Sequence, residues 1–275
     1  MKNKRIIGLC LALSLLTACG SNNAAEQTSN STSNSVPETS VTSGIGSVPE
    51  EPVSEVIPEG HAYAEFTNGM PEGWECADGW TNGSMFNVTW RKGNVTFNEG
   101  RMQLIIDKDK TPTGGIPYSG GEFRSKGFYG YGRYEVSMKP IKNDGVVSSF
   151  FSYTGPSDNN PWDEIDIEFL GKDTTIVQFN YFTDSRGNHE HIHKLGFDAS
   201  EDFHTYAFEW HKDKIVWFVD GEEVYSANES IPVTESKIMM NAWCGKDVDG
   251  WLNAFDDTNL PLTAEYEWIR FTPFE

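Results

Sequence analysis

Short segments that alternate polar and apolar residues, or that are rich in β-branched and aromatic residues, recur along this chain between Gly, Asn, Asp and Pro. No segment keeps a long apolar period of 3.6 residues, although residues 233–241 are compatible with one short helical turn. Many short strands separated by turns predict an all-β fold, a sandwich of two packed antiparallel sheets. The segments with this pattern are residues 101–107, 131–140, 146–155, 174–184, 204–213, 214–225 and 265–274.

Residues 214–225 carry the most specific local signal of this kind. The dipeptide Asp220-Gly221 divides the segment into two apolar runs. Asp-Gly is favoured in two-residue hairpin turns because both of its residues tolerate a positive φ. We therefore predict a β-hairpin that turns at Asp220 and Gly221.

The first 19 residues have the pattern of an export signal. Basic residues precede an apolar run over residues 6–16, and 16-LTAC-19 follows. The run is too short to span a bilayer, and its ending resembles a bacterial lipoprotein signal, which is cleaved before a cysteine that is then lipidated. We therefore predict an exported protein, secreted or held at the cell surface by a lipid anchor on Cys19. An ordinary secretory signal is the alternative.

Residues 20–58 differ in composition from the rest of the chain. They are rich in Ser, Thr, Asn, Pro and Glu, with almost no large apolar side chains. Such a segment cannot bury a core, so it is predicted to be a disordered tether. All nine tryptophans of the chain lie after it. Residues 59–275 are therefore predicted to form one domain.

Acidic residues outnumber basic ones in the whole chain, by 41 to 21, for a formal net charge of −20. After residue 59, 35 acidic residues face 18 basic ones. A surface this negative disfavours nucleic acid and other anionic polymers, whereas a neutral ligand is indifferent to it. We expect a monomer that has no nucleic-acid partner.

The chain contains four cysteines, two of which lie in the first 19 residues. Cys76 and Cys244 remain in the predicted domain. A single possible disulfide is not a framework, and spacing in sequence does not decide whether these two cysteines meet.

One segment, 162-WDEIDIEFLG-171, places Glu164, Asp166 and Glu168 at every second position with apolar residues between them. This alternation is the period of a β-strand, so the three acids share one face and the apolar residues share the other. Like charges on one strand face repel and raise one another's pKa, which costs stability unless function requires the arrangement. The alternative is a solvated acidic edge.

Paired carboxylates on one face suit the hydrolysis of glycosidic bonds. The α-carbons of Glu164 and Glu168 would lie about 13 Å apart on a strand, and two glutamate side chains can close much of that gap. One carboxylate attacks the anomeric carbon while the other protonates the leaving oxygen. Asp166 between them is suited to orienting the nucleophile. The spacing permits both the retaining and the inverting geometry.

Aromatic and polar residues near this segment are candidates for sugar contacts. Aromatic rings stack on the apolar faces of glucose units, and polar groups read their hydroxyls. For each aromatic residue, a place in the sandwich core is the alternative. The candidates are Phe151, Tyr153, Trp162, Trp243 and Trp251, together with the polar residues Asn82, Glu122, Arg124 and Asn180.

The run 189-HEHIH-193 places three histidines at alternate positions, which would bring their rings to one face of a strand. Three imidazoles on one face are metal-ligand chemistry in principle. Nothing nearby completes a site of known spacing, so exposed histidines on a strand or loop are the favoured interpretation.

The residues also match a known family. From about residue 66 to residue 271, the chain resembles the bacterial lichenases, which are endo-β-1,3-1,4-glucanases of glycoside hydrolase family 16. The segments that carry the resemblance are 136-VSMKP-140, 145-GVVSSFFSYTGP-156, 162-WDEIDIEFLGKDTT-175, 178-QFNY-181, 195-LGFDAS-200, 203-FHTYAFEW-210 and 237-KIMMNAWCG-245.

The resemblance implies a β-jelly-roll with a concave active-site cleft and a retaining mechanism. Glu164 would be the nucleophile, Glu168 the general acid/base and Asp166 an assisting residue, and no cofactor would take part in catalysis. The candidate aromatic and polar residues named above would contact the substrate.

The step from Asp166 to Glu168 bears on the substrate. The related β-1,3-glucanases carry a motif that resembles Glu-x-Asp-x-x-Glu, whose extra residue would bulge the strand. The two-residue step resembles the lichenases and the plant xyloglucan-active members. The resemblance therefore favours mixed-linkage β-glucan, with cleavage of β-1,4 bonds next to β-1,3 bonds. The alternatives are a β-1,3-glucanase, a xyloglucan-active enzyme and a carbohydrate-binding β-sandwich without catalysis.

The chain departs from the family pattern in several places. The disulfide of bacillus members would fall at Val88 and Gly120, where no bridge is possible. The resemblance implies a structural calcium held by backbone carbonyls near Glu65 and Gly100 and by Glu267, where relatives have aspartate. Two aromatics that often are tyrosines in relatives are Trp80 and Phe182 here.

Overall fold

The computed structural model describes residues 59–275. The predicted signal, lipidation site and tether, residues 1–58, lie outside the described residues. None of the helices within residues 59–275 is long and apolar enough to cross a membrane.

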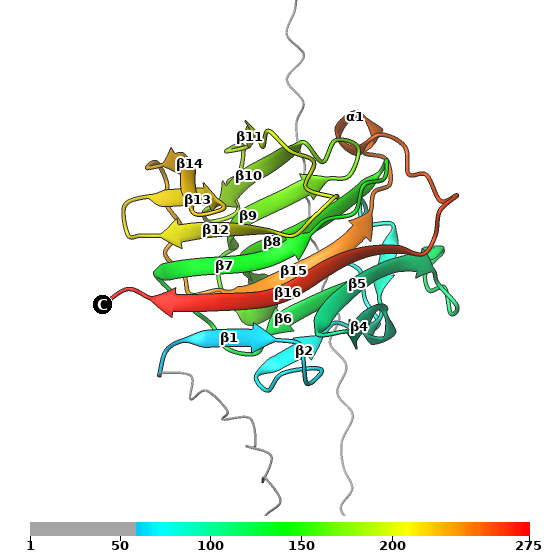
Figure 1. Cartoon of the computed structure of the whole chain (residues 1–275), viewed down its shortest axis with the longest axis horizontal. Helices are drawn as coiled ribbons and strands as arrows, with labels where there is room; N and C mark the ends of the chain where they lie inside the picture. The colour runs from blue at the N-terminus through cyan, green and yellow to red at the C-terminus, as the bar shows by residue number, and fades with distance from the viewer. Residues whose placement is uncertain (1–58) are drawn as a thin grey trace, which may run out of the picture. The chain divides into compact units, whose positions relative to one another are not determined.

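Strands of alternating burial form two antiparallel sheets, which we call sheet I and sheet II. Figure 1 shows sheet II lying over sheet I in this view, with the strands of the two sheets running in broadly similar directions. Sheet I has the strand order β11 (His191–Lys194), β10 (Ile176–Phe182), β9 (Asp163–Leu170), β8 (Val146–Thr154), β15 (Lys237–Cys244) and β6 (Tyr118–Ser125). Sheet II has the strand order β5 (Arg101–Lys108), β16 (Leu262–Pro273), β7 (Gly132–Lys139), β12 (His204–Trp210), β13 (Ile215–Val219) and β14 (Glu222–Ala227).

Strand β5 joins the two sheets. Its residues Met102–Ile106 pair with β16, and its last two residues, Asp107 and Lys108, pair with β6. Four short strands extend the sheets, of which only β3 pairs in parallel fashion; they are β1 (Ala62–Glu65) beside β16, β2 (Trp74–Cys76) and β3 (Val88–Trp90) beside β6, and β4 (Val95–Asn98) beside β5. The helical pieces are α1 (Asp249–Leu252) and the 3-10 turns η1 (Lys92–Asn94) and η2 (Pro156–Asp158).

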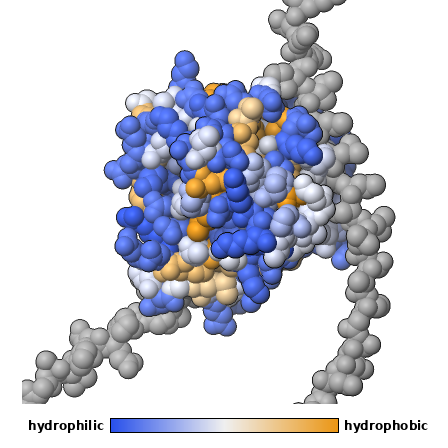
Figure 2. Space-filling view, turned by 90° about the vertical axis from the view of Figure 1, so that its right-hand side faces the viewer, coloured by the Kyte–Doolittle hydropathy of each residue, from blue (hydrophilic) through white to orange (hydrophobic). Residues whose placement is uncertain are grey.

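The core lies between the sheets and is rich in aromatic rings. Phe150 of β8 packs against Phe208 of β12 with ring centroids 5.9 Å apart, and Phe169 of β9 packs against Tyr206 at 4.8 Å. All four side chains are fully buried. On the face shown in Figure 2, hydrophilic residues surround a narrower band of hydrophobic ones. The prediction of an all-β sandwich is therefore confirmed.

The predicted hairpin is also confirmed. Strands β13 and β14 pair in antiparallel fashion around Asp220 and Gly221, whose φ angles are 49° and 84°. Both angles are positive, as a two-residue hairpin turn requires. The short helical turn considered for residues 233–241 does not form, because β15 begins at Lys237 and runs to Cys244 as a strand.

Candidate active site

Strand β9 presents its acidic residues and its apolar residues to opposite faces of sheet I. Ile165 and Ile167 are fully buried in the core between the sheets. Glu164 and Glu168 lie on the other face, which we call the outer face of sheet I, and remain partly accessible. Asp166 shares this face but is 4% exposed. The predicted sharing of one face by the three acids is therefore observed.

The register of sheet I builds a row of polar side chains level with Glu168. Gln178 of β10 and Ser149 of β8 flank Glu168, and Asn241 of β15 and Glu122 of β6 continue the row. Within it, the Ser149 hydroxyl donates to Asn241 Oδ1 at 2.6 Å. Five neighbouring strands thus place hydrogen-bonding groups in one line across the sheet.

A second row is level with Asp166. It contains Asn180 of β10, Phe151 of β8, Met239 of β15 and Arg124 of β6. Phe151 and Met239 are 6% and 5% exposed, respectively, so they form an apolar floor between the polar ends of the row.

A third row is level with Glu164. It contains Phe182 of β10, Tyr153 of β8 and Lys237 of β15. Burial, the largest cause, together with the charge of Glu164, raises the pKa of Tyr153 to about 12, so its hydroxyl stays protonated at neutral pH.

Glu164 accepts a hydrogen bond from Trp162 that favours its ionised form. The indole Nε1 of Trp162 donates to Glu164 Oε2 at 2.5 Å, and the side chain of Asp166 also hydrogen-bonds to Glu164. The Trp162 ring is itself stacked on Phe182, with centroids 4.6 Å apart. Trp162 therefore has a fixed orientation beside the carboxylate.

Glu168 has a different partner. Gln178 Nε2 donates to Glu168 Oε2 at 2.7 Å, and Gln178 Oε1 accepts from Trp251 Nε1 at 3.2 Å. Trp251 thereby fixes the orientation of the Gln178 amide, so that its N–H points at the carboxylate. The two glutamates of β9 are thus held by separate groups.

Three glutamates on this face have raised pKa values. Burial raises the pKa of Glu164 and of Glu168 above the usual range, and the hydrogen bonds described above oppose the rise. The charge of Glu122 raises the pKa of Glu164 further, and that of Glu164 raises the pKa of Glu168. Burial also raises the pKa of Glu122 itself to about 7. Clustered acids with shifted pKa values are typical of catalytic sites.

Asn82 and Glu122 are joined directly. Asn82 Nδ2 donates to Glu122 Oε2 at 3.3 Å, and Asn82 Oδ1 accepts from Trp90 Nε1 at 3.0 Å. Glu122 is 1% exposed, and Asn241 also hydrogen-bonds to it. The structure therefore brings these two predicted residues together at the β6 side of the outer face.

Arg124 lies one step along β6 from Glu122 on the same face. Its Nε donates to Glu75 Oε1 at 2.8 Å, and its guanidinium lies over the Trp80 ring, with Cζ 5.0 Å from the centroid. Trp80 is 39% exposed. A partly exposed aromatic ring thus borders the β6 side of the face.

Trp243 and Trp251 lie at the other end of β15 from Lys237. Trp243 is 2% exposed and packs against Phe86 at 4.1 Å between centroids. The ring centroids of Trp251 and Trp243 lie 6.0 Å apart, and Trp251 is partly exposed. Trp251 therefore has surface to offer a ligand, whereas Trp243 mainly supports its neighbours, as does the nearly buried Phe151.

Asn180 presents a buried acceptor. Its side chain is 5% exposed, and its Oδ1 has no hydrogen-bond partner among the described residues. Most buried polar atoms are paired, so an unpaired one next to Asp166 is a position where a ligand hydroxyl can donate.

The family model for glycosyl hydrolases family 16 matches residues 82–270, which include all three rows. The chain belongs to this family. A beta-glucanase of Acetivibrio thermocellus is 57% identical over 210 residues, which are 76% of this chain and 62% of that relative. The chain therefore spans less than two thirds of that protein.

Solved structures of family 16 proteins agree with the fold. A prokaryotic beta-1,3-1,4-glucanase (lichenase) from a mouse hindgut metagenome is 54% identical, with a TM-score of 0.75 over 78% of this chain and 99% of that chain. The Bacillus licheniformis beta-glucanase is 52% identical, with a TM-score of 0.73 over the same shares of the two chains. The predicted membership of family 16 and its jelly-roll fold are confirmed.

Glu267, the side chain expected to bind the family's calcium, has protein partners here. Glu267 Oε2 accepts a hydrogen bond from Ser137 at 2.8 Å, and an Arg101 nitrogen lies 3.9 Å from Glu267 Oε1. A calcium ion would have to displace a hydrogen bond and lie beside a guanidinium. No group of three or more acidic, His or Cys side chains suited to a metal occurs within residues 59–275.

The structure also places the two cysteines of the domain and the two positions of the family's disulfide. Cys76 and Cys244 are both free, the first half-buried and the second buried. Val88 and Gly120 lie on the paired strands β3 and β6, so the family's bridge position exists without its cysteines.

The three histidines differ from the sequence-based interpretation, because they are half-buried rather than exposed. His191 is stacked on Tyr225 with centroids 3.7 Å apart, and His189 is stacked on Tyr181 at 3.8 Å. Aromatic neighbours from β10 and β14 account for the difference, because these strands cover the histidine rings.

Five residues of the outer face were missed by sequence analysis: Ser149, Gln178, Lys237, Met239 and Asn241. Each alternates in phase with a candidate on the same strand, namely Phe151, Asn180 and Trp243. Strand period alone therefore places them on this face, but their contacts depend on pairing between strands distant in sequence.

Proposed function

We propose that this chain is an endo-acting retaining glycoside hydrolase that cleaves β-1,4 bonds next to β-1,3 bonds in mixed-linkage β-glucan. The observation that carries the proposal is the pair Glu164 and Glu168. They share one partly accessible face, have raised pKa values and are held by different partners. No cofactor is required for this chemistry.

Glu164 is the proposed nucleophile. The hydrogen bond donated by Trp162 favours its ionised form, which attacks the anomeric carbon of the sugar. The glycosidic carbon–oxygen bond breaks as Glu168 gives its proton to the leaving oxygen, and a covalent glycosyl-enzyme forms. Burial raises the pKa of Glu168, which favours the protonated form that this step requires.

Water completes the proposed cycle. After the leaving sugar departs, ionised Glu168 accepts a proton from a water molecule, whose oxygen attacks the anomeric carbon. The bond to Glu164 then breaks, and both carboxyl groups return to their first states. Two inversions at one carbon restore the β configuration of the product.

The rows on the outer face suit a neutral sugar chain. The buried acceptor of Asn180 and the polar groups of Glu122 and Arg124 are positioned for hydroxyls. Partly exposed rings of Trp80 and Trp162 are suited to stacking on glucose faces. The formal charge of −20 disfavours anionic polymers.

Mixed-linkage glucan is favoured over β-1,3-glucan by the shape of β9. Residues 164–168 pair with both neighbouring strands in continuous register, so no bulge interrupts the step from Asp166 to Glu168. The related solved protein named beta-1,3-1,4-glucanase (lichenase) supports the same substrate.

Sugar release from barley β-glucan, laminarin and xyloglucan, measured side by side, tests the substrate. We expect release from barley β-glucan to exceed that from the other two by far. A preference for laminarin or xyloglucan would instead identify another activity of the family.

The Glu164→Gln and Glu168→Gln variants test catalysis. Each should lower kcat on barley β-glucan by about 10³-fold or more, with an unchanged thermal midpoint. Near-wild-type hydrolysis by either variant would contradict the roles. Binding of the glucan without product release by the wild-type chain would indicate a carbohydrate-binding module.

Export and anchoring are part of the proposal. The signal pattern of residues 1–19 supports export and a lipid on Cys19, and the free chain is proposed to be a monomer. Cells that express the chain and take up a clickable fatty acid should label it, and Cys19→Ser should abolish the label. Size-exclusion chromatography with light scattering measures the mass of the unanchored domain.

A further inference from the structure

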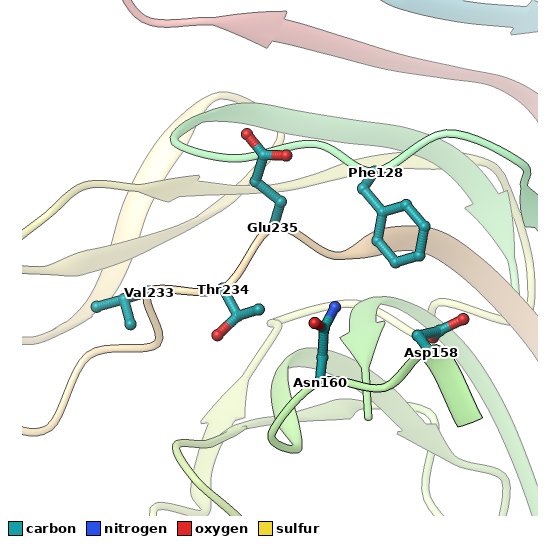
Figure 3. Close-up of a pocket in the computed structure, with 6 residues that line it drawn as sticks. All are labelled: Phe128, Asp158, Asn160, Val233, Thr234 and Glu235. Atoms are coloured by element: carbon teal, nitrogen blue, oxygen red, sulfur yellow. The ribbon is translucent and has the colours of Figure 1, made fainter. Parts of the chain in front are cut away.

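A pocket of about 520 Å³ lies where three loops meet at one end of sheet I. Figure 3 shows the loops: Phe128 follows β6, Asp158 and Asn160 lie between β8 and β9, and residues 233–235 precede β15. All these strand ends lie on the side of sheet I where β9 begins and Glu164 is located. The volume is within the range of small-molecule sites.

Hydrogen bonds fix the walls of this pocket, which we call the loop pocket. The buried carboxylate of Asp163 accepts from the backbone N–H of Val233 at 3.1 Å and of Thr234 at 3.0 Å. Tyr129 and Ser236 exchange two backbone hydrogen bonds of 2.9 Å, which join the Phe128 loop to the segment before β15. The pocket is therefore preformed, so little conformational entropy is lost on binding.

Lys237 connects the loop pocket to the outer face of sheet I. It pairs with Tyr153 in the row level with Glu164. Its Nζ lies 2.6 Å from Asp158 Oδ1 and 4.9 Å from the centroid of the Phe128 ring. The Lys237 side chain would thus lie between a ligand on the proposed catalytic face and a ligand in the loop pocket.

The lining of the loop pocket combines apolar surface with neutral polar groups. Phe128 is 38% exposed and Val233 is 66% exposed. Asn160 and Thr234 add an amide and a hydroxyl. This combination suits a sugar, whose apolar face packs on a ring while its hydroxyls hydrogen-bond at the edge.

Charge excludes two other kinds of ligand. Lys237 already neutralises Asp158, which leaves Glu235 as the unpaired charge of the lining and disfavours an anion. A single remaining carboxylate is also too few for a calcium site, which takes six to eight oxygen ligands. A neutral ligand fits the lining best.

We propose that the loop pocket is an accessory subsite for a β-linked glucose unit of the polysaccharide, separate from the rows on the outer face. This inference rests on the proposed function. The subsite adds contacts only for chains long enough to reach it, so it strengthens binding of polymer more than of short oligosaccharides.

Binding to barley β-glucan tests the subsite in the Glu164→Gln background, in which the polymer is not cut. Phe128→Ala in this background should weaken polymer binding by about three- to tenfold, whereas Phe128→Tyr should retain it. Phe274→Ala is the matched control, because Phe274 is 40% exposed and lies outside the loop pocket. Isothermal titration calorimetry measures the affinities, with a tetrasaccharide as the short ligand.

A second variant guards against misfolding of Phe128→Ala. Val233→Asp changes an exposed side chain and places a charge at the rim, so it should also weaken polymer binding. Unchanged affinity in both variants, or an equal loss in Phe274→Ala, would overturn the subsite. Failure of the proposed function would differ, because the wild-type chain would then release no sugar from barley β-glucan.

Discussion

At the scale of single residues, the two glutamate carboxylates of β9 are distinguished by their hydrogen-bond donors. Glu164 and Glu168 are chemically identical and share one strand face, yet Trp162 donates to the first and Gln178 to the second. The alternation in β9 predicted the shared face, because strand period is a local property. It did not predict Gln178, because that contact depends on the register between β9 and β10.

Gln178→Met removes the N–H that stabilises ionised Glu168, so the pKa of Glu168 should rise further. The proposed first step requires protonated Glu168, and the alkaline limb of kcat/KM should therefore move to higher pH. Loss of orientation should lower kcat by about tenfold or more. Hydrolysis rates of barley β-glucan across pH measure both effects.

Gln103→Met is the control for this variant, because Gln103 lies on β5 of sheet II. Its pH profile should match that of the wild-type protein. A Gln178→Met profile with an unmoved alkaline limb would contradict the role of this hydrogen bond.

Glu122→Gln should change how stability depends on pH. Burial raises the folded-state pKa of Glu122 from 4.5 to about 7, so its contribution to stability is present below pH 4.5 and is lost as pH rises to about 7. At about 1.4 kcal/mol per pKa unit, the loss is at most about 3 kcal/mol. The glutamine variant lacks this loss, and urea unfolding at several pH values measures the difference.

The pH dependence of stability that Glu265→Gln removes should have the opposite sign to that removed by Glu122→Gln. Hydrogen bonding to Lys139 and Gln103, against burial, lowers the pKa of Glu265, so its contribution to stability is lost as pH falls. Parallel pH dependence in the two variants would contradict the assignment for Glu122.

At the scale of elements, most strands were predicted, and β6 shows why some were not. Its sequence contains Gly120 and Gly121, which favour a break rather than a strand. In the structure a Cβ at Gly120 would lie 2.6 Å from the carbonyl oxygen of Ala242. The glycine is required by close approach to β15, a contact that sequence pattern does not reveal.

Gly120→Ala should therefore destabilise the domain by about 1–3 kcal/mol, because backbone must move to admit the methyl group. Gly93→Ala is the control, since a Cβ there meets nothing within 4 Å. Urea unfolding of both variants measures the difference. Equal free energies of unfolding for the two variants would show that β6 and β15 can move apart at little cost, which would contradict the prediction.

At the scale of the whole molecule, the sandwich was predictable because strand pattern and length suffice for it. The loop pocket was not, because it brings together three loops whose meeting depends on sheet order. The family's calcium site was expected from resemblance alone, and the contacts of Glu267 with Ser137 and Arg101 do not favour it.

The thermal midpoint should accordingly be the same with calcium and after treatment with EDTA at matched ionic strength. An ion that binds only the folded state at a hundred times its Kd would stabilise that state by about 2.7 kcal/mol. A midpoint that rises and saturates with calcium would restore the family's site.

The central claim is retaining cleavage of mixed-linkage β-glucan by Glu164 and Glu168. Proton NMR of barley β-glucan during early hydrolysis tests it most directly, because it resolves the anomer formed before mutarotation. Two successive displacements predict that the β-anomer appears first and the α-anomer grows in later. An α-anomer that appears first would contradict the mechanism.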